Sequence, residues 1–170
     1  MNGMRYRLIA MGLLVLGMGA GCVGYRLGTT LPPGIASIYI PTFENNTDEP
    51  RLETETTRAA IQEFQRDGTL KIAGERDADA RLDVVLLKFE LLPLRYEKDQ
   101  SRTTREYRML IRAKVTVTRT DNGEVLAERT VVGDEEFDFF GDLATSKIQN
   151  LPEAAEDLAH RIVELIVEYW

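Results

Sequence analysis

The sequence contains few of the residues that catalysis requires. Among 170 residues, Cys22 is the only cysteine and His160 the only histidine. A Ser-His-Asp triad or a histidine metal site would have to include His160, which has no evident partner in the sequence. The adjacent acids Glu135 and Glu136 should point to opposite faces of a strand, whereas paired hydrolytic carboxylates must converge across a cleft. No phosphate-binding glycine loop or zinc-binding cysteine pair is present. We therefore expect a non-enzyme without metal or cofactor.

Cys22 follows a stretch with the layout of an export signal. Arg5 and Arg7 form a positive region, residues 8–18 are apolar, and three small residues lead to the cysteine. This layout is typical of a secretory signal peptide. The apolar run is shorter than the roughly 20 residues that cross a bilayer as a helix. We predict that residues 1–21 are a signal peptide.

A cysteine directly after the small residues resembles the signal of bacterial lipoproteins. The resemblance implies cleavage before Cys22 and acylation of its thiol, with palmitate for example, and of its new amino group. Residue 23 is Val, whereas Asp at that position retains many such proteins at the inner membrane, so the resemblance implies the outer membrane. Gly19 replaces the usual Leu, and the alternative is an ordinary signal peptide followed by an incidental cysteine. Residues 22–34, rich in Gly and Pro, predict a lipidated tether.

Basic residues cluster in one part of an otherwise acidic chain. The formal net charge is −7, and loss of the signal peptide would remove two arginines. This balance argues against nucleic acid as a partner. Arginine sets bind the phosphates of anionic glycolipids through bidentate hydrogen bonds. The alternative is a solvated sheet face on which the cations pair with Glu124, Glu128 or their neighbours. The candidate glycolipid-binding residues are Arg95, Arg105, Arg108, Arg112 and Lys114. Arg102 lies in the same predicted loop as Arg95 and Arg105.

The first half of the chain predicts a strand followed by a helix. Residues 35–43 alternate in polarity, and Pro41 should end this strand or place it at a sheet edge. Residues 42–50 predict a loop whose polar residues serve turn formation and helix entry. Residues 52–67 carry apolar side chains at helical spacing, and Gly68 suits the left-handed residue after a helix.

Further strands follow the helix. Residues 70–73 predict a short strand. Residues 81–91 are apolar on both faces, which predicts a central strand. Pro93 should end its regular pairing, and residues 94–106 should form a polar crossing.

A hairpin is the clearest prediction of the second half. Residues 107–118 alternate strictly, as a half-buried antiparallel strand does. Residues 120–123 predict a turn in which Asn-Gly supplies positive φ angles, and residues 124–136 return as the last strand.

The chain should end in a helix over residues 151–170, with Asn150 as its N-cap and Pro152 in the first turn. Before it, residues 137–140 place three aromatic side chains among acids. These aromatics either anchor a partner or cover the end of a small core.

Strand, helix, several strands and helix together predict an α+β fold. We expect one two-layer domain over residues 35–170, with a small, largely antiparallel or mixed sheet of about four to five strands.

Several stretches of the chain resemble one known family. The chain after residue 21 begins Cys-Val-Gly-Tyr-Arg-Leu, and residues 41–47 read Pro-Thr-Phe-Glu-Asn-Asn-Thr. Residues 49–54 read Glu-Pro-Arg-Leu-Glu-Thr, and an Arg-Tyr pair at residues 95–96 and an Arg-Glu-Tyr-Arg stretch follow. Over nearly all of the mature chain, this pattern resembles the lipopolysaccharide-assembly lipoprotein family, LptE. Val23, inserted between the cysteine and Gly-Tyr, is a departure from it.

The resemblance implies two helices on one face of the sheet. It also implies an outer-membrane lipoprotein that plugs a large β-barrel partner, LptD, and helps place lipopolysaccharide in the outer leaflet. Family members bind lipopolysaccharide through basic residues, but no motif assigns these residues here. The alternative is a periplasmic lipoprotein that regulates a cell-wall synthase or forms part of a secretion pore. Three charges on the polar face of residues 107–118 disfavour a membrane-spanning hairpin.

Overall fold

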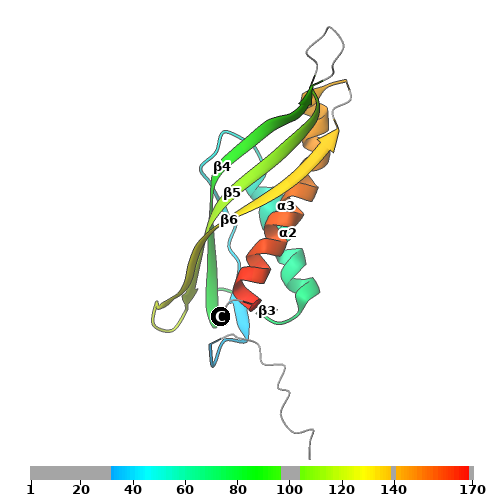
Figure 1. Cartoon of the computed structure of the whole chain (residues 1–170). Helices are drawn as coiled ribbons and strands as arrows, with labels where there is room; N and C mark the ends of the chain where they lie inside the picture. The colour runs from blue at the N-terminus through cyan, green and yellow to red at the C-terminus, as the bar shows by residue number, and fades with distance from the viewer. Residues whose placement is uncertain (1–31, 97–103, 139–140, 169–170) are drawn as a thin grey trace, which may run out of the picture.

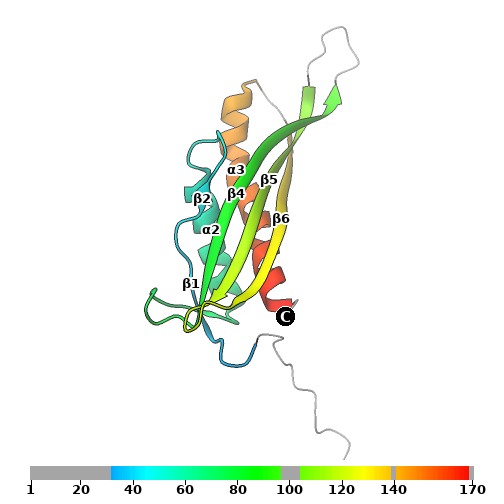
Figure 2. The ribbon, with the colours of Figure 1, turned by 90° about the vertical axis from the view of Figure 1, so that its left-hand side faces the viewer.

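The computed structural model describes residues 32–96, 104–138 and 141–168, which form a mixed sheet and two helices. Within these residues the sheet has six strands in the order β3-β1-β4-β5-β6, and β2 pairs with β4 outside this path. Both helices lie against the same face of the sheet (Figures 1 and 2). The predicted two-layer α+β fold is therefore confirmed. The elements are β1 (Ser37–Tyr39), β2 (Glu44–Asn45), α2 (Leu52–Asp67), β3 (Lys71–Ile72), β4 (Ala80–Tyr96), β5 (Thr104–Arg119), β6 (Val125–Asp138) and α3 (Leu143–Glu168).

Helix α2 has the predicted bounds because the residues that determine its buried face and its end lie within the helix or directly after it. Leu52, Ala60 and Phe64 are fully buried at helical spacing. Gly68 has a φ of 74°, and its N–H donates to the Phe64 carbonyl at 3.1 Å. This is the left-handed glycine stop that the sequence predicts. At the other end, Arg51 precedes the helix with a φ of 66° and makes no side-chain cap.

Pro41 ends β1, but it does not place this strand at a sheet edge. β1 lies between β3 and β4 and is parallel to both. The chain then returns to β4 as β2, inside the predicted loop, which the sequence analysis missed because β2 has only two residues. The rest of that loop serves helix entry as predicted. Asn45 accepts a hydrogen bond from the Thr47 N–H at 3.0 Å and donates one to Glu53 at 2.8 Å.

Pro93 ends only the regular pairing of β4 and not the strand itself, because register shifts follow between Pro93 and Arg95 and between Arg95 and Tyr96. β4 continues to Tyr96, and Pro93 pairs with Tyr107 of β5. The residues of β4 that pair with β1 and β2 end at Leu86, so no strand among the described residues lies on the other side of Pro93 and needs its missing N–H. The predicted polar crossing is consequently shorter, because residues 94–96 belong to β4 and residues 104–106 belong to β5.

β5 alternates as predicted. Its residues Met109, Ile111, Ala113, Val115 and Val117 are fully buried. At the hairpin that follows, only the glycine of Asn-Gly takes a positive φ, at 74°, whereas two such residues were expected. A register shift at the end of β5 accommodates this turn.

Helix α3 begins eight residues before the predicted start. Asp142 caps it by accepting hydrogen bonds from the Thr145 N–H at 2.9 Å and the Thr145 hydroxyl at 2.7 Å. These bonds hold the pKa of Asp142 below its ordinary value. Pro152 lies inside the helix instead of in its first turn, and Asn150 donates to the Ser146 carbonyl at 2.7 Å rather than capping.

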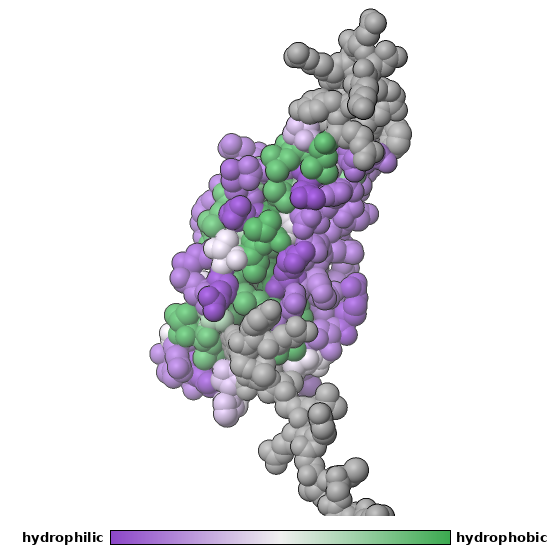
Figure 3. All heavy atoms as spheres, viewed as in Figure 1, coloured by the Kyte–Doolittle hydropathy of each residue, from purple (hydrophilic) through white to green (hydrophobic). Residues whose placement is uncertain are grey.

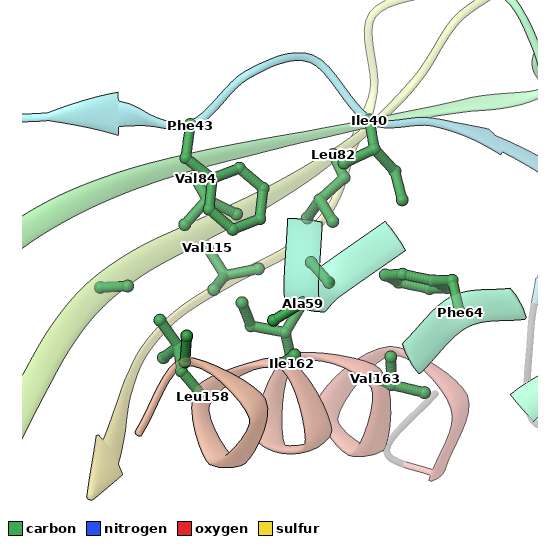
Figure 4. Close-up of a cluster of buried hydrophobic side chains, with 14 of the residues drawn as sticks. Ile40, Phe43, Ala59, Phe64, Leu82, Val84, Val115, Leu158, Ile162 and Val163 are labelled. Atoms are coloured by element: carbon green, nitrogen blue, oxygen red, sulfur yellow. The ribbon is translucent and has the colours of Figure 1, made fainter. Parts of the chain in front are cut away.

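The core lies between the two layers. Figure 4 shows Phe43 and Ile40 beside side chains of β4 and β5, with Leu158 and Ile162 of α3 beneath them. Within the described ranges, neither helix is both long and apolar enough to cross a bilayer.

Candidate binding surface

The predicted cations of β5 lie on the sheet face that points away from the helices, here called the outer face. Because the buried positions of β5 face α2 and α3, the alternate positions face the other way. Arg108, Arg112 and Lys114 are on this face. Figure 2 shows that no described element covers it.

Arg108 is paired with an acid of the neighbouring strand. Its Nε donates to Glu136 at 2.8 Å, its Nη2 makes a second contact with the same carboxylate, and Asp134 is 4.0 Å away. The two side chains of the main pair are 42% and 43% exposed. The hydrogen bonds and charge of Glu136 hold the pKa of Arg108 above its ordinary value. Arg108 therefore has a partner within the chain, as the solvated-face alternative predicts.

Lys114 is paired in the same way. Its ammonium lies 2.9 Å from Glu128 of β6, which is one of the two predicted partners. Glu124, the other predicted partner, lies 3.5 Å from Arg119 instead. Exposed ion pairs of this kind add little stability because solvent screens them, so a stronger anion could displace them.

Arg112 differs from both neighbours. It lies opposite Val132 on β6 and opposite Lys88 on β4, so neither strand places an acid directly opposite it. Its side chain is exposed, and no ion pair joins it to any residue of the described part of the chain. Lys88 pairs with Glu90 at 2.8 Å. Arg112 is therefore the predicted site residue best placed to bind an added anion.

The other candidate cations lie at the far end of the β4–β5 hairpin. Arg95 lies in β4 opposite Glu106, and Arg105 lies in β5. Their side chains and Arg102 lie outside the described residues, as does Cys22.

The outer face also carries exposed leucines, one of which, Leu87, lies in the stretch that the sequence predicts to be apolar on both faces. A register shift between Leu86 and Lys88 leaves Leu87 as a bulge and moves the residues after it to the opposite face. Leu87, Leu92 and Leu94 are consequently 42%, 41% and 41% exposed. Viewed from the side shown in Figure 1, hydrophobic residues form a band along the strands, with hydrophilic residues on both sides (Figure 3).

Of the three aromatic residues in the stretch 137–140, the structure describes Phe137, which belongs to the core. Phe137 is 5% exposed and stacks on Tyr107, with ring centroids 6.0 Å apart. The core alternative is therefore correct for Phe137. Residues 139–140 lie outside the described residues.

The other residues considered for catalysis, His160 and the pair Glu135 and Glu136, do not lie together in one site. His160 lies 3.2 Å from Glu63 of α2 and is 66% exposed. Glu136 is on the outer face, whereas Glu135 faces α3, where burial and the nearby Glu153 raise its pKa. Within the described ranges, no three metal-ligating side chains come close enough to hold an ion.

Comparison with family models gives a match over nearly all of the domain. The model of LptE, described as lipopolysaccharide-assembly, matches residues 35–169. A comparison with curated proteins gives no match.

Solved structures share the fold at low sequence identity. Lipoprotein B from Nitrosomonas europaea is 15% identical with a TM-score of 0.55, covering 86% of this chain and 92% of that one. The protein CT253 from Chlamydia trachomatis is 9% identical with a TM-score of 0.56, covering 78% and 95%. A dodecameric variant of PelC from Paraburkholderia phytofirmans is 11% identical with a TM-score of 0.52, covering 82% and 95%. At these identities the comparison supports the fold alone.

Proposed function

The chain belongs to the LptE family of lipopolysaccharide-assembly proteins, and from this premise we propose that it is an outer-membrane lipoprotein that plugs a β-barrel translocon of the LptD type. In this proposal it has no catalytic step. Acylated Cys22 holds it to the periplasmic face of the membrane, and the domain fills the barrel and presents lipopolysaccharide.

The shape of the domain supports this role. Gly34 lies beside Arg119 at the end of β5, so the tether joins the domain at the end that carries the β5–β6 turn. The 17 residues of β4 extend from this end over about 55 Å, at about 3.3 Å per residue. An anchored Cys22 would thus leave the β4–β5 hairpin free to reach far from the attachment point.

Arg112 is the observation that supports lipopolysaccharide binding most directly. It is an exposed guanidinium without an ion pair among the described residues, on an open sheet face where Leu87 precedes the residue opposite it and Leu92 lies farther along the same strand. A guanidinium binds phosphate in a bidentate manner, and leucines suit the acyl chains. Arg108 and Lys114 would have to exchange Glu136 and Glu128 for the ligand.

The test of this ligand compares charge reversals at two positions of one strand. We expect Arg112→Glu to weaken lipopolysaccharide binding by the purified lipoprotein about tenfold, whereas Arg108→Glu weakens it less. Circular dichroism would verify that both variants fold. Equal binding by wild type and Arg112→Glu would contradict the assignment of Arg112.

The partner is tested by affinity capture of the detergent-extracted protein. Stoichiometric co-purification of a large outer-membrane β-barrel would support the proposal. Co-purification of a peptidoglycan synthase, or recovery of a homo-oligomeric ring, would contradict it and favour the regulatory or pore role.

A further inference from the structure

A groove of about 230 Å³ lies between the start of α2 and the first turns of α3. It is smaller than the roughly 300–1,000 Å³ of typical small-molecule sites, which favours a side chain as its occupant. Ile148 in its wall is 67% exposed, more than any other large hydrophobic residue in the described ranges. Its lining includes Glu49, Arg51, Ala144, Lys147, Ile148 and Pro152.

The groove wall on α3 is an apolar stripe separate from the core. Ala144, Ile148 and Pro152 are spaced four residues apart and so lie on one side of the helix. Ala144 and Ile148 are exposed, and Pro152 is partly exposed. An amphipathic surface helix normally carries polar residues where these three lie.

Two polar groups at the groove are available to a partner. Pro152 has no N–H, so the Ile148 carbonyl lacks the helical hydrogen bond that residue 152 would otherwise supply. Across the groove, Arg51 is exposed, and no described residue forms an ion pair with it. In contrast, Lys147 and Glu49 are already paired at 2.7 Å and hold the wall in place.

We propose that this groove binds an extended segment of the β-barrel partner in which an aliphatic residue is adjacent to Asp or Glu; this inference rests on the proposed function. The aliphatic side chain fills the apolar floor. The carboxylate pairs with the Arg51 guanidinium, and a backbone N–H of the segment donates to the Ile148 carbonyl. A lipid acyl chain would use the apolar floor but leave Arg51 unused.

The test places a photoreactive amino acid at position 144, on the groove wall, in the full-length lipoprotein co-expressed with its barrel. We expect cross-links to a barrel peptide that contains an aliphatic residue next to an acid. Arg51→Gly should reduce their yield at least fivefold. This variant removes the guanidinium and also relieves the left-handed backbone, so unfolding would not explain a loss. Ile148→Asp should reduce the yield similarly.

The matched control is Val125→Asp, because Val125 is 57% exposed and lies in the distant hairpin. It should leave the cross-link unchanged. If no barrel co-purifies with the wild type, the proposed function itself fails. If the barrel co-purifies but position 144 does not cross-link to it, or cross-links only to lipid, the groove proposal alone is overturned. The same holds if Arg51→Gly has no effect.

Discussion

Gly133 lies where α3 approaches the sheet most closely. An added Cβ would be 2.6 Å from the Cβ and backbone N of Leu158 and 2.7 Å from its Cα. These contacts are too short, and the helix backbone cannot rotate away as a flexible side chain could. A Gly133→Ala substitution must therefore push α3 away from β6 or bend the strand.

We expect Gly133→Ala to lower the free energy of unfolding by about 2–3 kcal/mol, as overpacking of a core does. Urea denaturation would measure this loss. The control is Gly68→Ala, because Gly68 has nothing within 4 Å of its Cβ position and only its φ of 74° opposes a side chain. That control should cost about 1 kcal/mol. A smaller loss at Gly133 than at Gly68 would refute the close-approach argument.

Asp79, the residue directly before β4, forms hydrogen bonds with the first residues of the domain and holds them beside β4. Its carboxylate accepts hydrogen bonds from the Ala36 N–H at 3.0 Å, the Ser37 N–H at 2.9 Å and the Ser37 hydroxyl at 2.7 Å. These bonds, with the Ser37 hydroxyl foremost, lower its pKa from 3.8. A carboxyl with a lowered folded-state pKa stabilises the fold above its unfolded-state pKa, and this stability is lost as the pH falls through the folded-state value.

We therefore expect Asp79→Ala to lower the free energy of unfolding by about 1 kcal/mol at pH 7 and to have a smaller effect as the pH falls below the ordinary range of a carboxyl. Denaturation of both proteins across the acid range measures the difference. The hypothesis fails if the difference stays constant through the acid range, because the loss would then not depend on the charge.

At the scale of elements, α3 is unusual because it has a proline in its interior. Pro152 is the tenth residue of this 26-residue helix. A proline in a helix interior costs about 3 kcal/mol relative to Ala through its missing N–H and its ring. The helix tolerates this cost because its buried stripe continues on both sides of the proline, at Leu151, Ala155 and Leu158. Burial of that stripe offsets the local penalty.

Replacing Pro152 by Ala should restore the hydrogen bond to the Ile148 carbonyl and raise the free energy of unfolding by about 2 kcal/mol. Thermal denaturation would show this as a higher Tm. Glu153→Ala serves as the control, since it is exposed and should change stability by less than about 0.5 kcal/mol. An unchanged or lower Tm for Pro152→Ala would mean that the proline ring packs productively.

At the scale of the whole molecule, two attachments are proposed, the acyl chains on Cys22 and the barrel. Each CH₂ of an acyl chain that is buried in the bilayer contributes about 0.8 kcal/mol to membrane binding. Several chains on one cysteine are therefore sufficient to hold the protein at the membrane without the barrel. We expect wild type in the outer-membrane fraction with or without the barrel. Cys22→Ser should be found there only when the barrel is present. Fractionation of cells with and without barrel depletion tests this, and membrane-bound Cys22→Ser in depleted cells would contradict the role of the anchor.

Local patterns in the sequence were sufficient for α2 and β5. The bounds of α2 depend on its own spacing of apolar residues and on Gly68, and the faces of β5 depend on strict alternation. Both signals lie within a few residues of the structure that they predict. The positions of Arg108, Arg112 and Lys114 on one face follow from the same alternation.

The tertiary structure alone decided which of these cations has a partner. The pairing of Arg108 with Glu136 spans 28 residues and depends on the register between β5 and β6. The bulge at Leu87 exposes Leu87 and Leu92 on the face that carries Arg112, because one extra residue reverses the facing of the rest of the strand. The continuation of α3 through Pro152 likewise depends on packing against the sheet. Each outcome rests on contacts between residues distant in the chain, which local spacing does not encode.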